Sequence, residues 1–295
     1  MTASHALRRY QSTDDTKPSW ALVTGATNGM GYEWASQLAA LGFNVLIHGR
    51  DQAKLDKVKA DLTGASASSS RPIEVRTLVA DAGSVPPQLG QIAEAIDDPS
   101  LSLRVVVNNI GITNQDYPLL EEVSDEDACA MVALNTMFPT LVAKRALPKM
   151  KAAGGPALLI NVASLGAWAP SPYLSVYSGT KAYNLHFSRS LYNEQHSSPS
   201  PSQVDVVCMV PGTVISGMND GPPTSMMPTS HDWVKSAIAS LAPGWMSSRP
   251  GPVIVPWGAH ARGLKFLNAM PMGLGDRITR NFVVKERNKK RASGA

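Results

Sequence analysis

The 295 residues are 43% hydrophobic and 17% charged, which is typical of a globular chain and excludes a disordered or fibrous protein. The formal net charge is +4, and the basic excess gathers near the end, in KERNKKR (Lys285–Arg291), so no basic stripe for nucleic acid runs through the chain. The two cysteines, Cys129 and Cys208, have the spacing of neither a metal site nor a disulfide framework. We therefore expect a reduced, intracellular protein with no metal and no nucleic-acid partner.

The beginning of the chain is polar. The first nineteen residues, MTASHALRRYQSTDDTKPS, lack the apolar core of a signal peptide, and we interpret residues 1–18 as a polar N-terminal arm. No uninterrupted apolar run approaches the roughly 18 residues that are needed to span a bilayer. We predict a cytoplasmic protein with no integral membrane segment.

Seven apolar runs, rich in Val, Ile and Leu, alternate with helical segments from Trp20 onward. Helices are expected near 30–41, 54–62, 88–96, 125–150 and 175–195. Continuous apolar runs indicate strands that are buried on both faces. We therefore predict an α/β fold, a doubly wound parallel sheet of about seven strands with helices on both faces, formed by residues 19–284 as one domain. The runs are WALVTG, FNVLIHG, IEVRTLVAD, LRVVVNN, ALLINVAS, VDVVCMVPG and PVIVP.

Two late segments depart from this alternation. The stretch around 213–250 is rich in Met, Pro and Trp, and it fits either a mobile lid over an apolar ligand or a helix packed on the sheet. The basic end, residues 285–295, favours a solvated, frayed terminus. A weak contact with a membrane surface or nucleic acid is the alternative for this end.

The motif TGATNGMG follows the first strand and opens the first helix. Its glycines are spaced for a tight turn, for close approach of the backbone to a pyrophosphate, and for free amides at a helix N-terminus. A glycine triplet alone is a weak signal, but its place between strand and helix is what a phosphate site requires. The sequence therefore predicts a dinucleotide-binding turn made by Gly25, Thr27, Asn28, Gly29, Met30 and Gly31.

The end of the second strand should decide between the two nicotinamide cofactors. An acidic residue there binds a ribose 2′-hydroxyl, whereas an arginine binds a 2′-phosphate. The sequence is IHGRD, which places Arg50 at that position and favours NADPH/NADP+ over NAD. Asp51 follows immediately, and its alternative role is to start the next helix.

A tyrosine and a lysine stand four residues apart in VYSGTKAY (Val176–Tyr183). On a helix, Tyr177 and Lys181 lie one turn apart on the same face, so the phenol and the ammonium can approach each other. A free tyrosine with a pKa near 10 is a reluctant proton donor or acceptor at neutral pH, and a neighbouring cation lowers that pKa. The pair is a candidate acid/base unit, and a surface pair without function is the alternative.

Together these motifs resemble the short-chain dehydrogenase/reductase family of the single-domain, Rossmann-type kind. TGATNGMG resembles its cofactor glycine motif, and NNIG (Asn108–Gly111) resembles the motif that ends its fourth strand. The resemblance covers nearly the whole chain and implies an oxidoreductase. It implies a catalytic tetrad of Asn135, Ser164, Tyr177 and Lys181, with further cofactor contacts from Asp81, Asn109, Gly111, Tyr177, Lys181, Pro211, Gly212 and Val214.

The resemblance also implies a role for each member of the tetrad. Tyr177 is the general acid in ketone reduction, Lys181 tunes it and holds the nicotinamide ribose, and Ser164 hydrogen-bonds the substrate carbonyl. Pro139 lies four residues after Asn135 and lacks an amide hydrogen, so we expect the helix to kink and the Asn135 carbonyl to be freed for a water molecule.

A narrower similarity is to the subgroup of 17-beta-hydroxysteroid dehydrogenases and very-long-chain 3-oxoacyl-CoA reductases. It implies NADPH-dependent reduction of a ketone on a large lipophilic substrate, such as a steroid, fatty acyl or polyketide-like compound. A homodimer or homotetramer built through helices 125–150 and 175–195 is expected, and peripheral location at the endoplasmic reticulum is the alternative to the cytoplasm. Recruitment of the fold for non-redox cyclase or isomerase chemistry is the alternative function. Candidate residues for the substrate side are Trp168, Tyr173, Met218 and Trp233.

Overall fold

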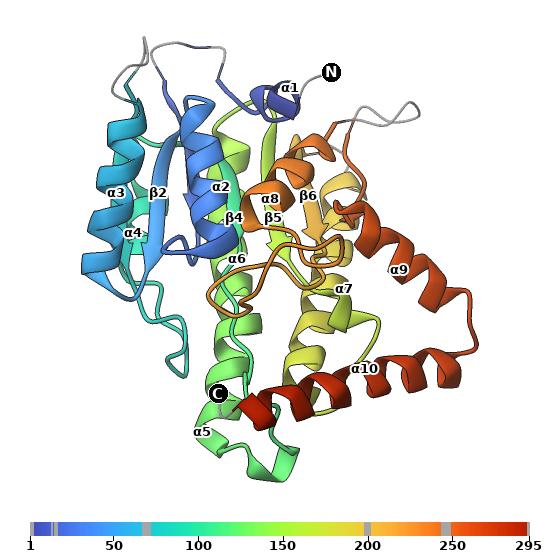
Figure 1. Ribbon diagram of the computed structural model, residues 1–295. Coiled ribbons are helices and arrows are strands. Elements are labelled where there is room, and N and C mark those ends of the chain that lie inside the picture. The colour runs from blue at the N-terminus through green and yellow to red at the C-terminus, as the bar shows by residue number, and fades with distance from the viewer. Residues whose placement is uncertain are drawn as a thin grey trace.

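The computed structural model describes residues 3–12, 14, 17–66, 72–197, 202–242 and 249–293. Within them the chain forms a seven-stranded sheet in which every strand pair is parallel, as predicted, with the order β3-β2-β1-β4-β5-β6-β7 (Figure 1). The strands are β1 Ser19–Val23, β2 Asn44–Gly49, β3 Val75–Val79, β4 Ser102–Asn108, β5 Ala157–Val162, β6 Val204–Met209 and β7 Val253–Ile254.

The sheet grows outward from its centre. The chain adds β2 and β3 on one side of β1, then returns to place β4 on the other side of β1, followed by β5 to β7. The direction of winding therefore reverses between β1 and β4. Ligands of open α/β sheets bind outside the carboxyl ends of the strands at such a reversal.

Helices cover both faces of the sheet, so the fold is doubly wound as predicted (Figure 1). One apolar cluster joins the sheet to α2 (Gly29–Ala40), α3 (Gln52–Ser66) and α8 (Ser230–Ala239). A second cluster joins the opposite face to α4 (Gln91–Asp97), α6 (Phe138–Ala152) and α7 (Ser175–Ser197). β1, β2, β5 and β6 are buried along their whole length on both faces, which is why most of their residues are apolar.

The helix expected at 125–150 is divided into three parts. α5 (Asp125–Val132) is followed by a π turn, η2 (Ala133–Met137), and then by α6. Pro139 stands at the second position of α6, where its missing amide hydrogen is tolerated. The predicted irregularity is therefore present, and it takes the form of a π turn just before the proline.

The interpretation of residues 1–18 as a polar arm is wrong for the part that the structure describes. α1 (Ala3–Arg8) packs on α8, and Ala6, Leu7 and Tyr10 are buried in the first apolar cluster. The Tyr10 hydroxyl donates to Asp205 Oδ2 at 2.7 Å. Apolar residues spaced by three or four positions form one helix face, and this pattern was masked by the polar composition around it.

The end of the chain also differs from its prediction. The basic run is not frayed over its described length; it belongs to a 22-residue helix, α10 (Met272–Ser293), which follows α9 (Gly258–Asn268). α10 contacts the loops that follow β4 and β5, because Lys290 donates to the Gln115 carbonyl at 3.1 Å and the Arg287 guanidinium lies 4.0 Å from the Tyr173 ring centroid. Among the described residues, no helix has both the length and the apolar character that a membrane span requires.

The packing of α1 predicts a specific loss of stability. Leu7 is completely buried, so we expect Leu7→Ala to lower the free energy of unfolding by about 2–5 kcal/mol through lost burial and a residual cavity. The neighbouring exposed residue provides the control, because Arg8→Ala should change stability by less than about 0.5 kcal/mol. Urea unfolding of both variants measures the difference, and an equal effect would show that α1 does not belong to the core.

Candidate active site

Three elements bring the predicted tetrad together at the carboxyl end of the sheet. Asn135 lies in the π turn η2, Ser164 follows β5 and caps the short helix η3 (Leu165–Ala167), and Tyr177 and Lys181 lie on α7. The Ser164 hydroxyl accepts from the Gly166 amide at 3.2 Å and is hydrogen-bonded to the Tyr177 phenol. A serine and a tyrosine that share a hydrogen bond can both face one carbonyl oxygen.

Lys181 is held against this pair. Its ammonium donates to the Val162 carbonyl at 3.0 Å and lies 5.7 Å from the centroid of the Tyr177 ring. Burial lowers the pKa of Lys181 to about 8, so the group is still mostly a cation at neutral pH. The one-turn spacing thus places the cation beside the phenol, as the sequence predicts.

The pKa of Tyr177 is raised in the protein without cofactor, whereas the sequence predicts that Lys181 lowers it. Burial raises it, and the hydrogen bond from Ser164 opposes that rise without cancelling it. The lowering expected from Lys181 is therefore not found, and burial decides the direction of the shift. A positive nicotinamide beside the phenol would add the missing opposite charge.

Asn135 locks the loop after β4 to α7. Its side-chain oxygen accepts from the Ile112 amide at 2.9 Å, while its side-chain nitrogen donates to the Ile112 carbonyl at 2.9 Å and to the Thr180 hydroxyl at 3.0 Å. The Asn135 backbone carbonyl accepts from Asn184 Nδ2 at 2.9 Å. The expectation of a carbonyl freed for water is therefore wrong in its detail, because an α7 side chain takes the place of the lost backbone donor.

The glycine turn fits a dinucleotide phosphate. Gly25 and Gly29 have φ values of 65° and 54°, and a Cβ on Gly31 would lie 2.0 Å from the Gly25 carbonyl oxygen. The turn leads into the N-terminus of α2, where Asn28 makes no side-chain cap and no acidic residue occupies the first turn. These amides and the helix dipole suit an anion, and the absence of side chains lets it approach the backbone.

The other predicted residues around this turn fall into two groups. Thr27 and Met30 are half-buried and Arg50 and Asp81 are exposed, Asp81 accepting from the Gly83 amide at 3.0 Å. Asp51 accepts from the Lys54 amide at 3.1 Å and so starts α3, which is the alternative role considered for it. Its carboxylate is thus occupied by a structural role.

Asn109 and Gly111 link the glycine turn to Lys181. Asn109 Nδ2 donates to the Thr24 and Gly25 carbonyls at 3.3 and 3.4 Å, and its side-chain oxygen is buried without a partner among the described atoms. A Cβ on Gly111 would lie 3.1 Å from the Lys181 ammonium. The NNIG stretch therefore leaves a free acceptor and an open backbone surface between the two halves of the site.

The turn after β6 depends on a residue that sequence reasoning missed. His260 of α9 is buried; its Nδ1 accepts from the Gly212 amide at 3.0 Å, and its Nε2 lies 3.0 Å from the Met226 carbonyl. Burial lowers its pKa, which favours this neutral tautomer. The buried Pro211 and Val214 flank the turn. No local motif marks His260, because its partners lie 34 and 48 positions away.

The four substrate-side candidates have different surroundings. Trp233 of α8 is completely buried in the core, so the prediction that it lines the substrate side is wrong. For α8, the interpretation of segment 213–250 as a helix packed on the sheet holds. Residues 243–248 of that segment lie outside the described residues. Met218 is half-buried in the loop before α8. Trp168 lines a cavity of about 210 Å³ together with α9 and α10.

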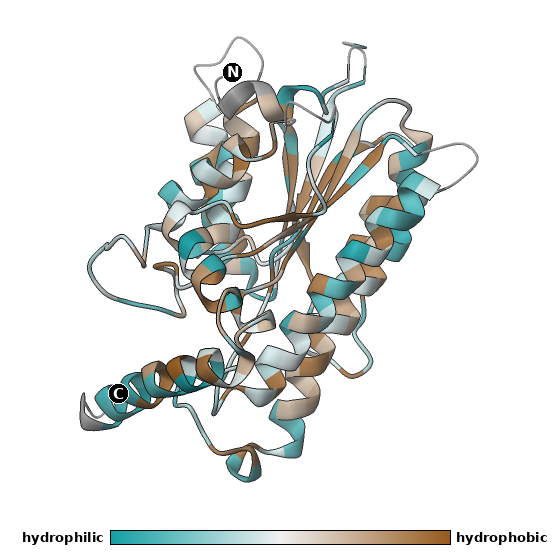
Figure 2. Ribbon diagram, turned by 90° about the vertical axis from the view of Figure 1, so that its right-hand side faces the viewer, coloured by the Kyte–Doolittle hydropathy of each residue, from teal (hydrophilic) through white to brown (hydrophobic). Residues whose placement is uncertain are grey.

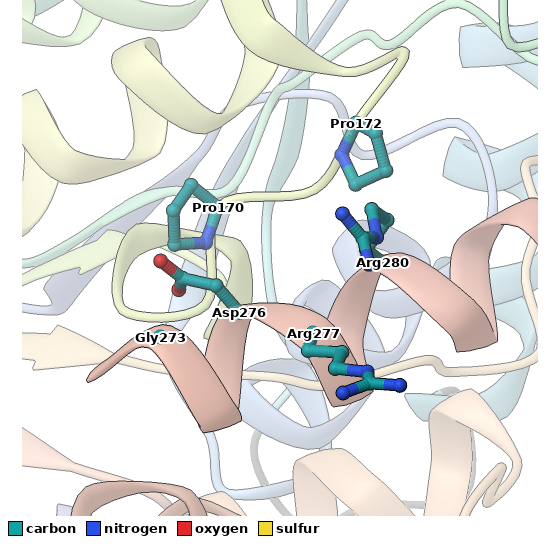
Figure 3. A pocket seen from close by; sticks show the side chains of 6 residues that line it. All are labelled: Pro170, Pro172, Gly273, Asp276, Arg277 and Arg280. Carbon is teal, nitrogen blue, oxygen red and sulfur yellow. The ribbon is translucent and has the colours of Figure 1, made fainter. Parts of the chain in front are cut away.

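Tyr173 lies beneath α10, next to a second cavity of about 400 Å³. Figure 3 shows Pro170 and Pro172 on one side of that cavity and Asp276 and Arg280 of α10 on the other. Both cavities are thus lined partly by the segment that connects Ser164 to Tyr177. Across the described part of the chain, no group of three His, Cys, Asp or Glu residues is arranged to hold a metal ion.

A parallel doubly wound sheet with a glycine turn at its reversal point and a Ser–Tyr–Lys cluster at the same edge is typical of oxidoreductases that use a nicotinamide dinucleotide. The comparison with known families agrees, because the model of the short chain dehydrogenase family matches residues 19–224. The chain belongs to the short-chain dehydrogenase family, as the sequence motifs predict.

Individual relatives confirm the narrower resemblance. The chain is 30% identical over 266 residues to a very-long-chain 3-oxoacyl-CoA reductase of Pyricularia oryzae, covering 89% of this chain and 76% of the relative. It is 32% identical over 264 residues to very-long-chain 3-oxoacyl-CoA reductase-B of Danio rerio, covering 87% and 80%. A short-chain dehydrogenase from Sphingobium yanoikuyae, solved with NADPH, shares the fold with a TM-score of 0.68 at 24% identity, over 87% of this chain and 94% of that chain.

The glycine turn predicts that one added methyl group strongly weakens cofactor binding. A Cβ at residue 31 would collide with the Gly25 carbonyl, so we expect Gly31→Ala to weaken the binding of a nicotinamide dinucleotide by at least about 100-fold, the equivalent of roughly 2.7 kcal/mol. Gly64→Ala in α3 is the matched control, since a Cβ there has no neighbour within 4 Å among the described atoms. Fluorescence titration with NADPH and NADH measures both, and unchanged binding in the first variant would contradict the assignment.

Proposed function

We propose that this protein uses NADPH to reduce a ketone on a fairly large lipophilic substrate to a secondary alcohol. The observation that carries the proposal is the Ser164–Tyr177–Lys181 cluster at the same sheet edge as the glycine turn. Arg50 supports NADPH, because it is exposed at the end of β2 while the neighbouring Asp51 is engaged in starting α3. The similarity to 3-oxoacyl-CoA reductases supports a fatty acyl ketone within the lipophilic class.

The residues divide the work of the reduction. A bound nicotinamide supplies the hydride that the carbonyl carbon receives. Tyr177 donates its phenolic proton to the carbonyl oxygen, which completes the alcohol, and Ser164 donates a hydrogen bond to that oxygen as negative charge develops on it. The ammonium of Lys181 stabilises the tyrosinate that remains. Asn135 acts as a positioning residue, since it fixes α7 against the loop after β4.

Non-redox cyclase or isomerase chemistry is not favoured. Recruited members of such a fold commonly lose part of the catalytic set, whereas this chain retains all four members, Asn135, Ser164, Tyr177 and Lys181.

Assembly as a homodimer or homotetramer is also a proposal. Three exposed apolar residues support it on the expected faces, namely Val132 of α5, Met137 of the π turn and Tyr183 of α7. The cytoplasmic location stays a prediction.

The proposed role of Tyr177 as general acid predicts that removing its phenolic oxygen slows ketone reduction. We expect Tyr177→Phe to lower kcat for ketone reduction by about 10²–10⁴-fold, because the proton donor is lost while the ring remains. NADPH affinity should change by less than about threefold. Oxidation of NADPH with a panel of steroid, 3-oxoacyl and polyketide-like ketones, with NADH in parallel, measures the effect. Tyr192→Phe on the same helix is the control, and equal rates in the two variants would sink the assignment.

The lysine predicts a pH dependence. Its pKa is about 8, so Lys181 is an ammonium below that pH and becomes neutral above it. We therefore expect kcat for reduction to fall as the pH rises through about 8, because the tyrosinate loses its stabilising charge. The measurement is the pH profile of kcat at saturating NADPH and ketone. A flat profile through pH 8 would show that the charge of Lys181 has no part in the step.

A further inference from the structure

The outer face of α10 is unlike any other helix surface that the structure describes. Three exposed apolar residues follow one another at spacings of four, Leu274, Ile278 and Phe282, so they lie on one face. Phe266 of α9 and Met272 at the start of α10 are also exposed, by 63% and 80%, and Phe282 by 62%. Isolated exposed apolar residues are ordinary, but five within seventeen positions, three of them in one row, mark an apolar surface of this helix pair.

The same face becomes basic toward its end. Lys285 and Lys289 continue the exposed row at spacings of three and four after Phe282, and Arg277 is exposed beside its apolar half. α10 as a whole contains seven Lys or Arg residues and two Asp or Glu residues, a net charge of +5, whereas the whole chain carries +4. The rest of the protein is therefore close to neutral, and its positive charge is concentrated in this helix.

The opposite face of α10 contacts the protein. Val283 is buried, and Glu286, Arg287 and Lys290 are half-buried, with Arg287 over the Tyr173 ring and Lys290 5.4 Å from the Tyr117 ring centroid. The acidic Glu286 thus points away from the outer face. Figure 2 shows α10 extending from the body of the domain, so its outer face is not covered by another described element.

We infer that this outer face docks on an anionic membrane surface. An interfacial helix needs an apolar row that enters the boundary of headgroups and acyl chains, and lysines or arginines that reach the headgroups, and α10 supplies both. A second copy of the chain fits the face poorly, because it would bring a second helix of net charge +5 against the first. Anionic lipid provides the complementary charge.

Docking in this way would turn the substrate end toward the membrane. α10 forms one side of the cavities that the segment between Ser164 and Tyr177 forms on the other. The row Leu274, Ile278 and Phe282 lines neither cavity, whereas Met272 and Arg277 lie at the border and each line one of the two cavities. The inference goes beyond the proposed reaction and does not depend on it, since membrane binding is measured without cofactor or ketone.

The test uses the full-length protein and sedimentation with vesicles of phosphatidylcholine, with or without phosphatidylserine. We expect binding to the phosphatidylserine vesicles that weakens as salt is raised, because the attraction is screened. The triple variant Leu274→Ser, Ile278→Ser and Phe282→Ser should bind these vesicles at least about tenfold more weakly. The pair Lys285→Glu and Lys289→Glu should reduce it by about fivefold or more per residue.

The controls separate docking from folding and from self-association. Val85→Ser and Lys54→Glu change similarly exposed residues away from α10 and should bind vesicles like the wild type. Circular dichroism and NADPH affinity check that each variant is folded. Equal binding to both kinds of vesicle, or undiminished binding by the α10 variants, overturns the inference. The inference is also overturned if the wild type binds no vesicles and light scattering shows that it is a dimer, while the apolar triple variant is a monomer.

Discussion

The side chain of Asn135 is the contact on which the active-site end of the sheet depends. Its amide is completely buried and is satisfied by the backbone of Ile112 and the hydroxyl of Thr180, which belong to two separate elements. Leaving such a buried group unpaired costs about 1–3 kcal/mol. The loop after β4, the π turn and α7 therefore have one mutual arrangement, and that arrangement presents Tyr177 and Lys181.

A second set of contacts braces the same end from outside. Tyr117 and Tyr173 are the two residues other than glycine, within the described chain, that have positive φ, at 53° and 65°. Such a conformation costs a bulky residue about 1–3 kcal/mol and persists only where the surroundings hold it. Cations of α10, Arg287 and Lys290, cover these two rings. One helix thus orders the loops after β4 and β5 while its other face remains available for the proposed docking.

Much of the frame was predictable from local pattern. Apolar runs mark strands buried on two faces, and the carboxyl ends of parallel strands meet at one edge, so the glycine turn, Ser164 and the Tyr177–Lys181 pair had to converge there. Composition predicted less reliably which individual side chains are buried. The polar residues around Leu7 and Tyr10 hid a core helix, and an apolar type alone could not tell whether Trp233 faces a substrate or the core.

The sequence by itself thus determined the parallel sheet, the glycine turn and the chemical groups of the Ser164–Tyr177–Lys181 cluster, because each follows from residue type and short spacing. Only the tertiary structure decided which partner each buried polar group has: Tyr10 bonds to Asp205, 195 positions away, His260 holds Gly212, and Asn184 takes the carbonyl of Asn135. Such partners depend on contacts between distant elements, and a hydrogen bond between residues far apart in the chain leaves no periodic trace in the sequence.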